Sequence, residues 1–340
     1  MKALNSSTQT NQQDVAVENH SRSRLFTFGC SFTKYHWATW ADILGQEFTE
    51  HQNWGQTGGG NLFIFCSLIE AIQRGSINEK DTVVIMWSSP GREDRWVNGE
   101  WITPGSIYNQ DVYPKDWVDK FADPTGYLIR DAALISSAIK VLDNIKCKYY
   151  MLSMMPFEII NDADISIIQK IKSKFNLVSG AEQNNISSLS SDLADIFELY
   201  QSSIDKIRSS MFETVFNNDW YSRTGFKTKT WIETSYKESK ESWAPHWPEY
   251  ENFIDKQVTE EILQEIKQCY DFEDIELFIK EIHRFQNRND IHPTPLEHLE
   301  YLQKILPEIP VTETTVKWTQ ARQLDAEKGI LFNHPDLVRF

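Results

Sequence analysis

A serine and a histidine, far apart in the chain, have the surroundings best suited to nucleophilic chemistry. Ser31 lies in the stretch FTFGCSFTKYHW, directly after a short apolar segment with the alternation of a buried strand. His292 lies in NDIHPTP, just before a segment with the pattern of a helix. A serine hydroxyl becomes an effective nucleophile only when an adjacent base takes its proton. The chemistry is therefore available only if the fold brings His292 against Ser31.

Two neighbours of His292 are candidates for orienting its imidazole ring. Asp290 would act through its charge and a hydrogen bond, and Asn289 would act through its side-chain carbonyl oxygen. A carboxylate also stabilises the imidazolium that forms during attack, which favours Asp290. Both residues remain candidates at this stage.

Ser31 also has a purely structural interpretation. Serine is favoured as the N-cap of a helix, and a helix-like pattern follows Ser31 at residues 37–47. If Ser31 is only a cap, its replacement by alanine should cost about 1 kcal/mol of stability and no activity. The four cysteines, Cys30, Cys66, Cys147 and Cys269, form no CxxC pair and no metal-ligand spacing, so we expect free thiols, no metal and no cofactor.

The elements around these residues predict an α/β protein. Segments typical of strands alternate with segments typical of helices, which indicates a parallel sheet with helices on both faces. The predicted strands are 24–29, a short one ending near Asn53, 81–87 and 146–154, and the predicted helices between them are 37–47, 62–75 and 127–144. Ligands bind at the carboxyl ends of the strands in such sheets, where the turns 29–33, 55–61 and 87–95 should meet.

The rest of the chain divides by composition. We expect a flexible N-terminal arm at 1–23, an α/β core formed by 24–156 and 286–310, a helical, Trp-bearing insertion at 157–285, and an irregular C-terminal tail at 311–340. A helix should begin after Thr294, with Pro295 in its first turn and Glu297 completing a capping box. His292 is then held on a short loop before that helix.

Four blocks of sequence resemble the SGNH/GDSL hydrolase superfamily. In chain order they are GCSFT, NWGQTGGGN, WSSPGRED and NDIHP, and the resemblance covers residues 24–154 and 286–306. Members of that superfamily are esterases, lipases and carbohydrate deacetylases. The resemblance implies a three-layer α/β/α sandwich with a mostly parallel, flavodoxin-like sheet, here enlarged by the helical insertion.

The resemblance also implies roles for particular residues. It makes Ser31 the nucleophile and an oxyanion donor through its N–H, His292 the base, and Gly58 a second oxyanion donor, with Gly59 as the alternative. The asparagine of the family's third block is not in register here, where the strand ends in WSSP. Ser89 could donate in its place, or Asn61 or Arg92 could reach in. Arg92 and Trp87 are also candidates for substrate contact, with core packing as the alternative for Trp87.

The function implied is hydrolysis of a small ester through an acyl-enzyme, for example removal of O-acetyl groups from a saccharide. Trp96, Trp101 and Trp117 could line a sugar-stacking rim, or they could be core residues. The alternative is a non-catalytic member of the fold that serves as a binding or structural component, for example of a phage particle. The glycine turn 55–61 does not fit a phosphate-binding loop, since it lacks the lysine of GxxxxGK[ST].

The bulk properties exclude other classes of protein. A net charge of −15 argues against binding to nucleic acid and to an anionic membrane surface. No apolar run is long enough to span a membrane, and the first residues lack the apolar region of a signal peptide. We therefore expect a cytoplasmic protein or a phage-particle component, in which the polar arm and the tail would suit contacts with protein partners.

Overall fold

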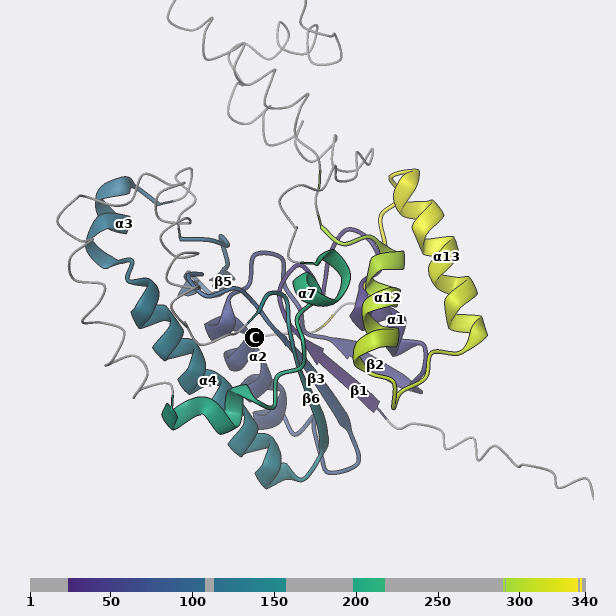
Figure 1. Ribbon diagram of the computed structural model, residues 1–340, viewed down its shortest axis with the longest axis horizontal. Coiled ribbons are helices and arrows are strands. Elements are labelled where there is room, and N and C mark those ends of the chain that lie inside the picture. Colours follow the sequence, from purple (N-terminus) through teal and green to yellow (C-terminus); the bar gives the residue numbers. More distant parts are fainter. Residues whose placement is uncertain are drawn as a thin grey trace, which may run out of the picture.

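The computed structural model describes residues 24–107, 113–156, 198–217, 290, 292–335 and 337. A four-stranded parallel sheet lies at its centre, in the order β2-β1-β3-β6, with helices on both faces (Figure 1). The strands are β1 (Arg24–Phe28), β2 (Glu50–Asn53), β3 (Thr82–Trp87) and β6 (Lys148–Ser153). The predicted α/β/α fold class is confirmed.

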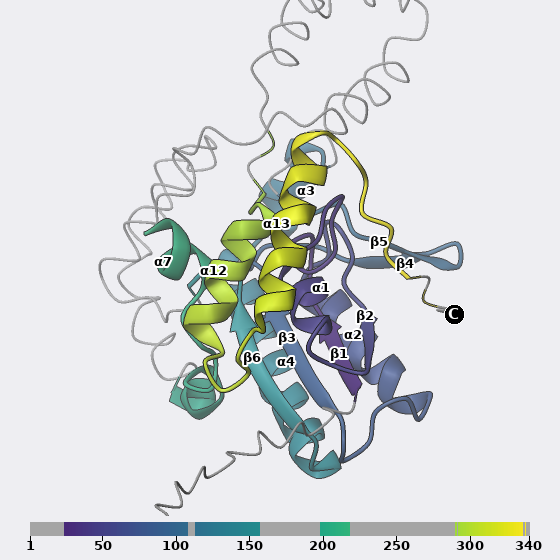
Figure 2. The ribbon, with the colours of Figure 1, turned by 90° about the vertical axis from the view of Figure 1, so that its right-hand side faces the viewer.

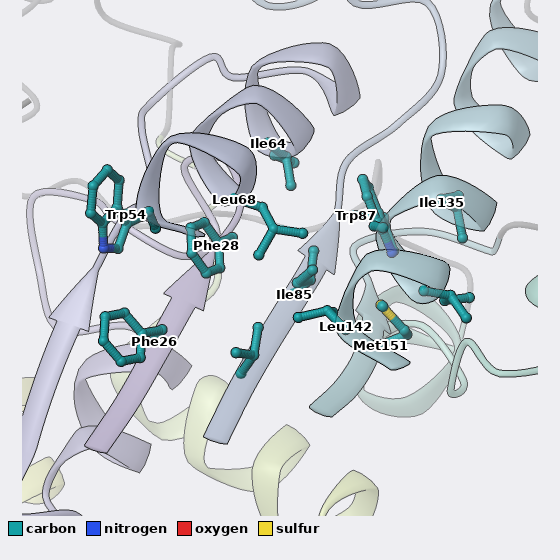
Figure 3. Packing of buried hydrophobic residues seen from close by; sticks show 14 of the residues in the cluster. Phe26, Phe28, Trp54, Ile64, Leu68, Ile85, Trp87, Ile135, Leu142 and Met151 are labelled. Atoms are coloured by element: carbon teal, nitrogen blue, oxygen red, sulfur yellow. The ribbon is translucent and has the colours of Figure 1, made fainter. Parts of the chain in front are cut away.

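The two helical layers follow from the alternation of side chains along the buried strands. In β3 all six residues are buried, as expected for a strand covered on both faces. Ile85 and Trp87 point into a core shared with α2 (Asn61–Gln73) and α4 (Pro124–Ile145), which Figure 3 shows at close range. Val84 and Met86 point into a second core, shared with α1 (Trp40–Gly45) and α12 (Pro295–Ile305). Burying one such side chain stabilises the fold by roughly 1.5–3 kcal/mol, so the sheet is fixed from both sides.

The strand order creates a switch point at the carboxyl end of β1. The chain leaves β1, passes through α1 to β2 on one side, and then returns through α2 to β3 on the other side of β1. The two connections run over opposite faces of the sheet, and ligands of open α/β sheets bind outside the carboxyl end of the strand at such a point. The turn that carries Ser31 begins there.

The ends of two helices test the predicted boundaries. α1 is shorter than the predicted helix 37–47, because Thr39 is its N-cap and Asp42 Oδ2 accepts hydrogen bonds from the Thr39 N–H and hydroxyl. The capping box before α12 is confirmed, since Thr294 Oγ accepts from Glu297 N and Glu297 Oε2 accepts from Thr294 N.

The prediction of an irregular tail at 311–340 is wrong over α13 (Glu313–Glu327). This helix packs beside α12, as Figure 2 shows. Its buried stripe consists mainly of polar residues: Thr315, Thr319, Gln323 and Ala326. A stripe of that composition carries no apolar periodicity, so the pattern of hydrophobic residues did not reveal the helix.

The remaining described elements lie around the core. They are the hairpin β4 (Arg95–Val97) and β5 (Glu100–Ile102), α3 (Lys115–Phe121) and α7 (Met211–Phe216). Met211 and Phe212 are buried in the same core as α12, so this part of the predicted insertion packs on the α/β core. The N-terminal arm and most of 157–285 lie outside the described residues. Within the described part of the chain, no helix is long and apolar enough to cross a membrane.

Candidate active site

Ser31 lies in a tight turn directly after β1. The Cys30 carbonyl accepts hydrogen bonds from Thr33 N at 2.9 Å and Lys34 N at 3.1 Å, so one helical turn closes around Ser31. A Cβ atom on Gly29 would lie 1.9 Å from Thr33 Oγ1, so only glycine allows the strand to pass so close to this turn. α1 starts at Trp40, with Thr39 as its N-cap, so Ser31 is not the cap of that helix.

His292 closes a chain of hydrogen bonds from Ser31 to Asp290. Its Nε2 lies 3.0 Å from Ser31 Oγ, although the two residues are 261 positions apart in the sequence. Its Nδ1 lies 2.8 Å from Asp290 Oδ1. The predicted approach of Ser31 and His292 is confirmed, and Asp290 is a partner of the ring. Asn289, the other candidate partner, lies outside the described residues.

The environment of Asp290 keeps its carboxylate charged. Burial acts to raise the pKa of Asp290, but the hydrogen bonds and the charge of His292, together with the Tyr35 hydroxyl, outweigh it, so the pKa lies below its usual value. A carboxylate accepts hydrogen bonds only, so the proton of the neutral imidazole resides on Nδ1. The lone pair of Nε2 then points at Ser31 Oγ, which is the arrangement that a general base requires. The Asp290 side chain is fully buried and that of His292 is 28% exposed, so the base remains reachable.

Gly59 is not an oxyanion donor, because its N–H already donates to the Gln56 carbonyl at 3.0 Å. The same turn is tied to the Ser31 loop, since Gln56 N donates to the Gly29 carbonyl at 3.1 Å. The glycine turn 55–61, called the glycine loop from here on, is therefore fixed beside the turn that carries Ser31.

Gly58 has the conformation expected for the predicted donor. Its φ of +77° lies in the left-handed region, and a Cβ there would lie 1.9 Å from the Thr103 carbonyl oxygen, so the position requires glycine. Among the described residues, no hydrogen-bond acceptor occupies the backbone N–H of Gly58 or of Ser31. Both N–H groups therefore remain candidates for stabilising an oxyanion.

The prediction that Asn61 reaches the oxyanion is wrong, because its amide is already committed. Asn61 Nδ2 donates to the Ser88 carbonyl at 3.1 Å and to Asp131 Oδ2 at 2.7 Å, and Asn61 Oδ1 accepts from Ser88 N at 2.7 Å. These bonds fasten the start of α2 to the end of β3 and to α4. Burial raises the pKa of Asp131 to about 6, although Arg130 and Asn61 act against it.

Ser89 and Arg92 contact each other beside the glycine loop. Arg92 Nε donates to Ser89 Oγ at 3.2 Å, and Arg92 Nη1 donates to the Gly59 carbonyl at 3.1 Å. The Ser89 hydroxyl accepts from Arg92 and still has its own proton to donate, so its role as a third oxyanion donor stays a prediction. Trp87 is fully buried in the core between the sheet, α2 and α4, so the prediction that it contacts substrate is wrong.

Tyr35 is a site residue that the sequence did not reveal. Its hydroxyl donates to Asp290 Oδ2 at 2.6 Å, and its ring stacks on the His292 ring with a centroid distance of 3.9 Å. The only signal was the aromatic run YHW that follows Ser31. Nothing in that run indicates a partner 255 residues away.

A cavity of about 530 Å³ lies between the β4 region, α3 and α4. Its wall combines rings with charged groups of both signs: Trp117, Phe121, Tyr127, Glu93, Arg95, Asp123 and Arg130. Arg130 donates to the Arg92 carbonyl, which connects this wall to the residue that holds the glycine loop. Within the described ranges, no group of three His, Cys, Asp or Glu side chains is arranged to hold a metal ion.

Comparisons with known proteins leave the family of the chain open. No protein-family model matches the chain, and no curated protein matches it. A solved structure of a member of the lipolytic G-D-S-L family from Veillonella parvula is similar, with a TM-score of 0.30 and 13% identity over 60% of this chain and 86% of that one. The geometry of Ser31, His292 and Asp290 is what indicates chemistry at this site.

Proposed function

We propose that the protein hydrolyses an ester through an acyl-enzyme formed on Ser31. The observation that carries the proposal is the continuous chain from Ser31 Oγ to His292 and on to the buried Asp290 carboxylate. A serine that is held in a tight turn, with a base at hydrogen-bond distance and an orienting carboxylate behind the base, is the arrangement of an activated nucleophile.

The reaction would use these groups in two steps. Ser31 Oγ attacks the ester carbonyl carbon while its proton passes to His292 Nε2, and the Asp290 carboxylate stabilises the imidazolium. The backbone N–H groups of Ser31 and Gly58 donate to the oxyanion. His292 then gives the proton to the departing alcohol as the C–O bond breaks. In the second step His292 takes a proton from water while the water oxygen attacks the acyl carbon. The bond between the acyl carbon and Ser31 Oγ then breaks, His292 returns the proton to Ser31 Oγ, and the acid leaves.

We propose an acylated saccharide as the substrate class. The supporting feature is the cavity near the glycine loop, which combines aromatic rings with carboxylates and guanidinium groups. Rings that face a sugar provide apolar stacking area, and charged side chains bind hydroxyl groups and fix orientation. Trp117 contributes to this wall, and Trp96 on β4 is 50% exposed, whereas Trp101 is partly buried against Phe63.

The decisive experiment is labelling with a fluorophosphonate, which reacts with activated serines and requires no knowledge of the substrate. We expect the label on the peptide that contains Ser31, and we expect the Ser31→Ala variant to lose both labelling and hydrolysis of a chromogenic acetate ester, by roughly 10⁴-fold or more. Ser137→Ala is the matched control, because among the described residues the Ser137 hydroxyl bonds only to the Ala133 carbonyl of its own helix. If the unaltered protein shows neither labelling nor hydrolysis, the hydrolase proposal fails and a non-catalytic binding or structural role takes its place.

A further inference from the structure

Tyr35 contacts the acid–base pair in two different ways. Its hydroxyl donates to Asp290 Oδ2, whereas Asp290 Oδ1 accepts from both His292 N and His292 Nδ1. Its ring covers one face of the imidazole, with an interplanar angle of 21°. The hydroxyl therefore fixes the second oxygen of the carboxylate, and the ring restricts rotation of the base.

The loop that carries Tyr35 is anchored on the same segment as His292. Trp37 Nε1 donates to the Pro293 carbonyl at 2.8 Å, directly after His292. Tyr35 and Trp37 meet edge to face and form a buried cluster with Ala326 of α13. The two aromatic residues thus lie between the His292 loop and the C-terminal helix.

Residues 330–335, which we call the C-terminal strap, hold this loop from the other side. Phe332 N donates to the His36 carbonyl at 2.8 Å, and His334 Nε2 donates to the Tyr35 carbonyl at 2.6 Å. Phe332 packs edge to face against Trp318 of α13 and against the His334 ring. The strap therefore connects α13 to the backbone of Tyr35.

The second ring nitrogen of His334 also faces an acceptor. His334 Nδ1 lies 3.2 Å from Asp42 Oδ1, and the His334 side chain is only 10% exposed. The two ring nitrogens of His334 thus face two different elements, the Tyr35 carbonyl on one side and the Asp42 carboxylate of α1 on the other. These two contacts of His334 join α1 to the Tyr35 loop.

We propose that Tyr35 is a positioning residue for the His292–Asp290 pair and that the C-terminal strap, through His334, holds Tyr35 in place. This inference rests on the proposed hydrolase function only for its kinetic consequences. Its structural content is that the hydrogen bond from Tyr35 sets how strongly Asp290 attracts the imidazole proton. Without that bond, negative charge concentrates on the oxygen that faces His292.

The first test is Tyr35→Phe, which keeps the stacked ring and removes only the hydroxyl. We expect kcat to fall about 3- to 10-fold, because the lost orientation of the Asp290 carboxylate and the His292 ring outweighs the stronger attraction of that carboxylate for the imidazolium. The carboxylate becomes a stronger acceptor and favours the imidazolium, so the acidic limb of the kcat/KM profile should move to higher pH by about half a unit. Tyr149→Phe is the matched control, because the Tyr149 hydroxyl also donates to an aspartate, Asp143, at 2.6 Å, but at the opposite end of the sheet.

A second measurement keeps this test independent of turnover. The proton between His292 Nδ1 and Asp290 should give a far-downfield NMR signal, and in Tyr35→Phe that signal should move further downfield. If the protein is not a hydrolase, the rates vanish but the NMR comparison still decides the role of Tyr35. An unchanged signal, or an unchanged acidic limb in an active protein, would overturn the proposal.

The strap is tested with His334→Ala in the full-length chain. We expect a loss of activity in the same direction as for Tyr35→Phe, and a double variant whose loss is smaller than the product of the two single losses, because both changes act on one contact. Leu331→Ala is the control in the same strap, since Leu331 is 60% exposed. His334→Gln keeps one side-chain donor and should have more activity than His334→Ala. The glutamine variant also tests the strap if the alanine variant does not fold. Fully multiplicative losses, or no loss in either His334 variant, would show that the strap does not act through Tyr35.

Discussion

The Asp290→Asn variant separates the charge of Asp290 from its geometry. An amide has almost the shape of the carboxylate and keeps one oxygen that can accept from His292 Nδ1, which lies 2.8 Å from Asp290 Oδ1. The change therefore removes the negative charge beneath the imidazole and leaves the packing nearly intact. The Asp290 side chain is fully buried, so solvent screens this charge little.

The magnitude follows from the contact. Placing the carboxylate and the imidazolium about 4 Å apart between charge centres, at an effective dielectric constant of about 20, gives about 4 kcal/mol of attraction. Because the imidazolium exists only once His292 has taken the Ser31 proton, most of this energy is lost from the transition state. We expect kcat/KM to fall about 10³-fold. An amide that turns its NH₂ toward Nδ1 would favour the wrong tautomer and lower the rate further.

The assay is hydrolysis of a chromogenic acetate ester at neutral pH, accompanied by the rate of fluorophosphonate labelling and by the melting temperature. Asp143→Asn is the control, because Asp143 also accepts from a tyrosine but is 54% exposed and lies at the other end of the sheet. A loss of less than about tenfold at an unchanged melting temperature would refute the reasoning, since the buried charge would then contribute little to the imidazolium.

Two further predictions concern stability. Replacing Asn61 with alanine removes three buried hydrogen bonds and leaves the Ser88 N–H and the Asp131 carboxylate without that partner. The free energy of unfolding, measured by urea denaturation, should therefore fall by about 3–5 kcal/mol. A fall of less than about 1 kcal/mol would contradict this account. Burial lowers the pKa of His51 to about 4, so the unfolded chain binds the extra proton and stability is lost as the pH falls from about 6.5 to about 4. Burial raises the pKa of Asp131 to about 6, so the folded state binds the extra proton and stability is gained as the pH falls from about 6 to about 4. In His51→Gln the gain from Asp131 remains, so the free energy of unfolding should rise as the pH falls from about 6.5 to about 4. In Asp131→Asn the loss from His51 remains, so the free energy of unfolding should fall over the same range. If both variants keep the slope of unfolding free energy against pH that the unaltered protein shows, these assignments are wrong.

The sheet and the Ser31–His292 contact could be predicted because each has a strong local signal. In the run TVVIMW every residue after the threonine is apolar and the first four are β-branched, which is typical of a strand covered on both faces. The capping box at Thr294 fixed where α12 begins and so placed His292 at the end of a loop. The resemblance in the order of the sequence blocks then predicted that Ser31 and His292 share the carboxyl edge of one parallel sheet.

The rest of the site could not be predicted because it depends on which polar groups are already occupied. Asn61 and Gly59 have the right residue types near the right strand ends, but Ser88, Asp131 and Gln56 already bond to the groups that would have donated. The spacing of residues in a sequence can predict that two groups lie close together, but it does not predict toward which acceptor an N–H group points. The helix α13 was not predicted because its buried stripe is mainly polar and shows no apolar periodicity.

The acid–base residues of the candidate site are held by more contacts than its oxyanion donors, and this difference affects which esters the site can cleave. The acid–base half is supported from several sides: Asp290 accepts three hydrogen bonds, and Tyr35, Trp37 and the C-terminal strap brace the His292 loop. The oxyanion half has two candidate backbone donors, and the Asn61 amide instead holds β3 to α2. Removing one oxyanion donor from a serine hydrolase costs about 10²–10³ in rate. A third donor at Ser89 would therefore decide whether the site cleaves ordinary esters or only those with good leaving groups, whereas the activation of Ser31 by His292 and Asp290 is the same in both cases.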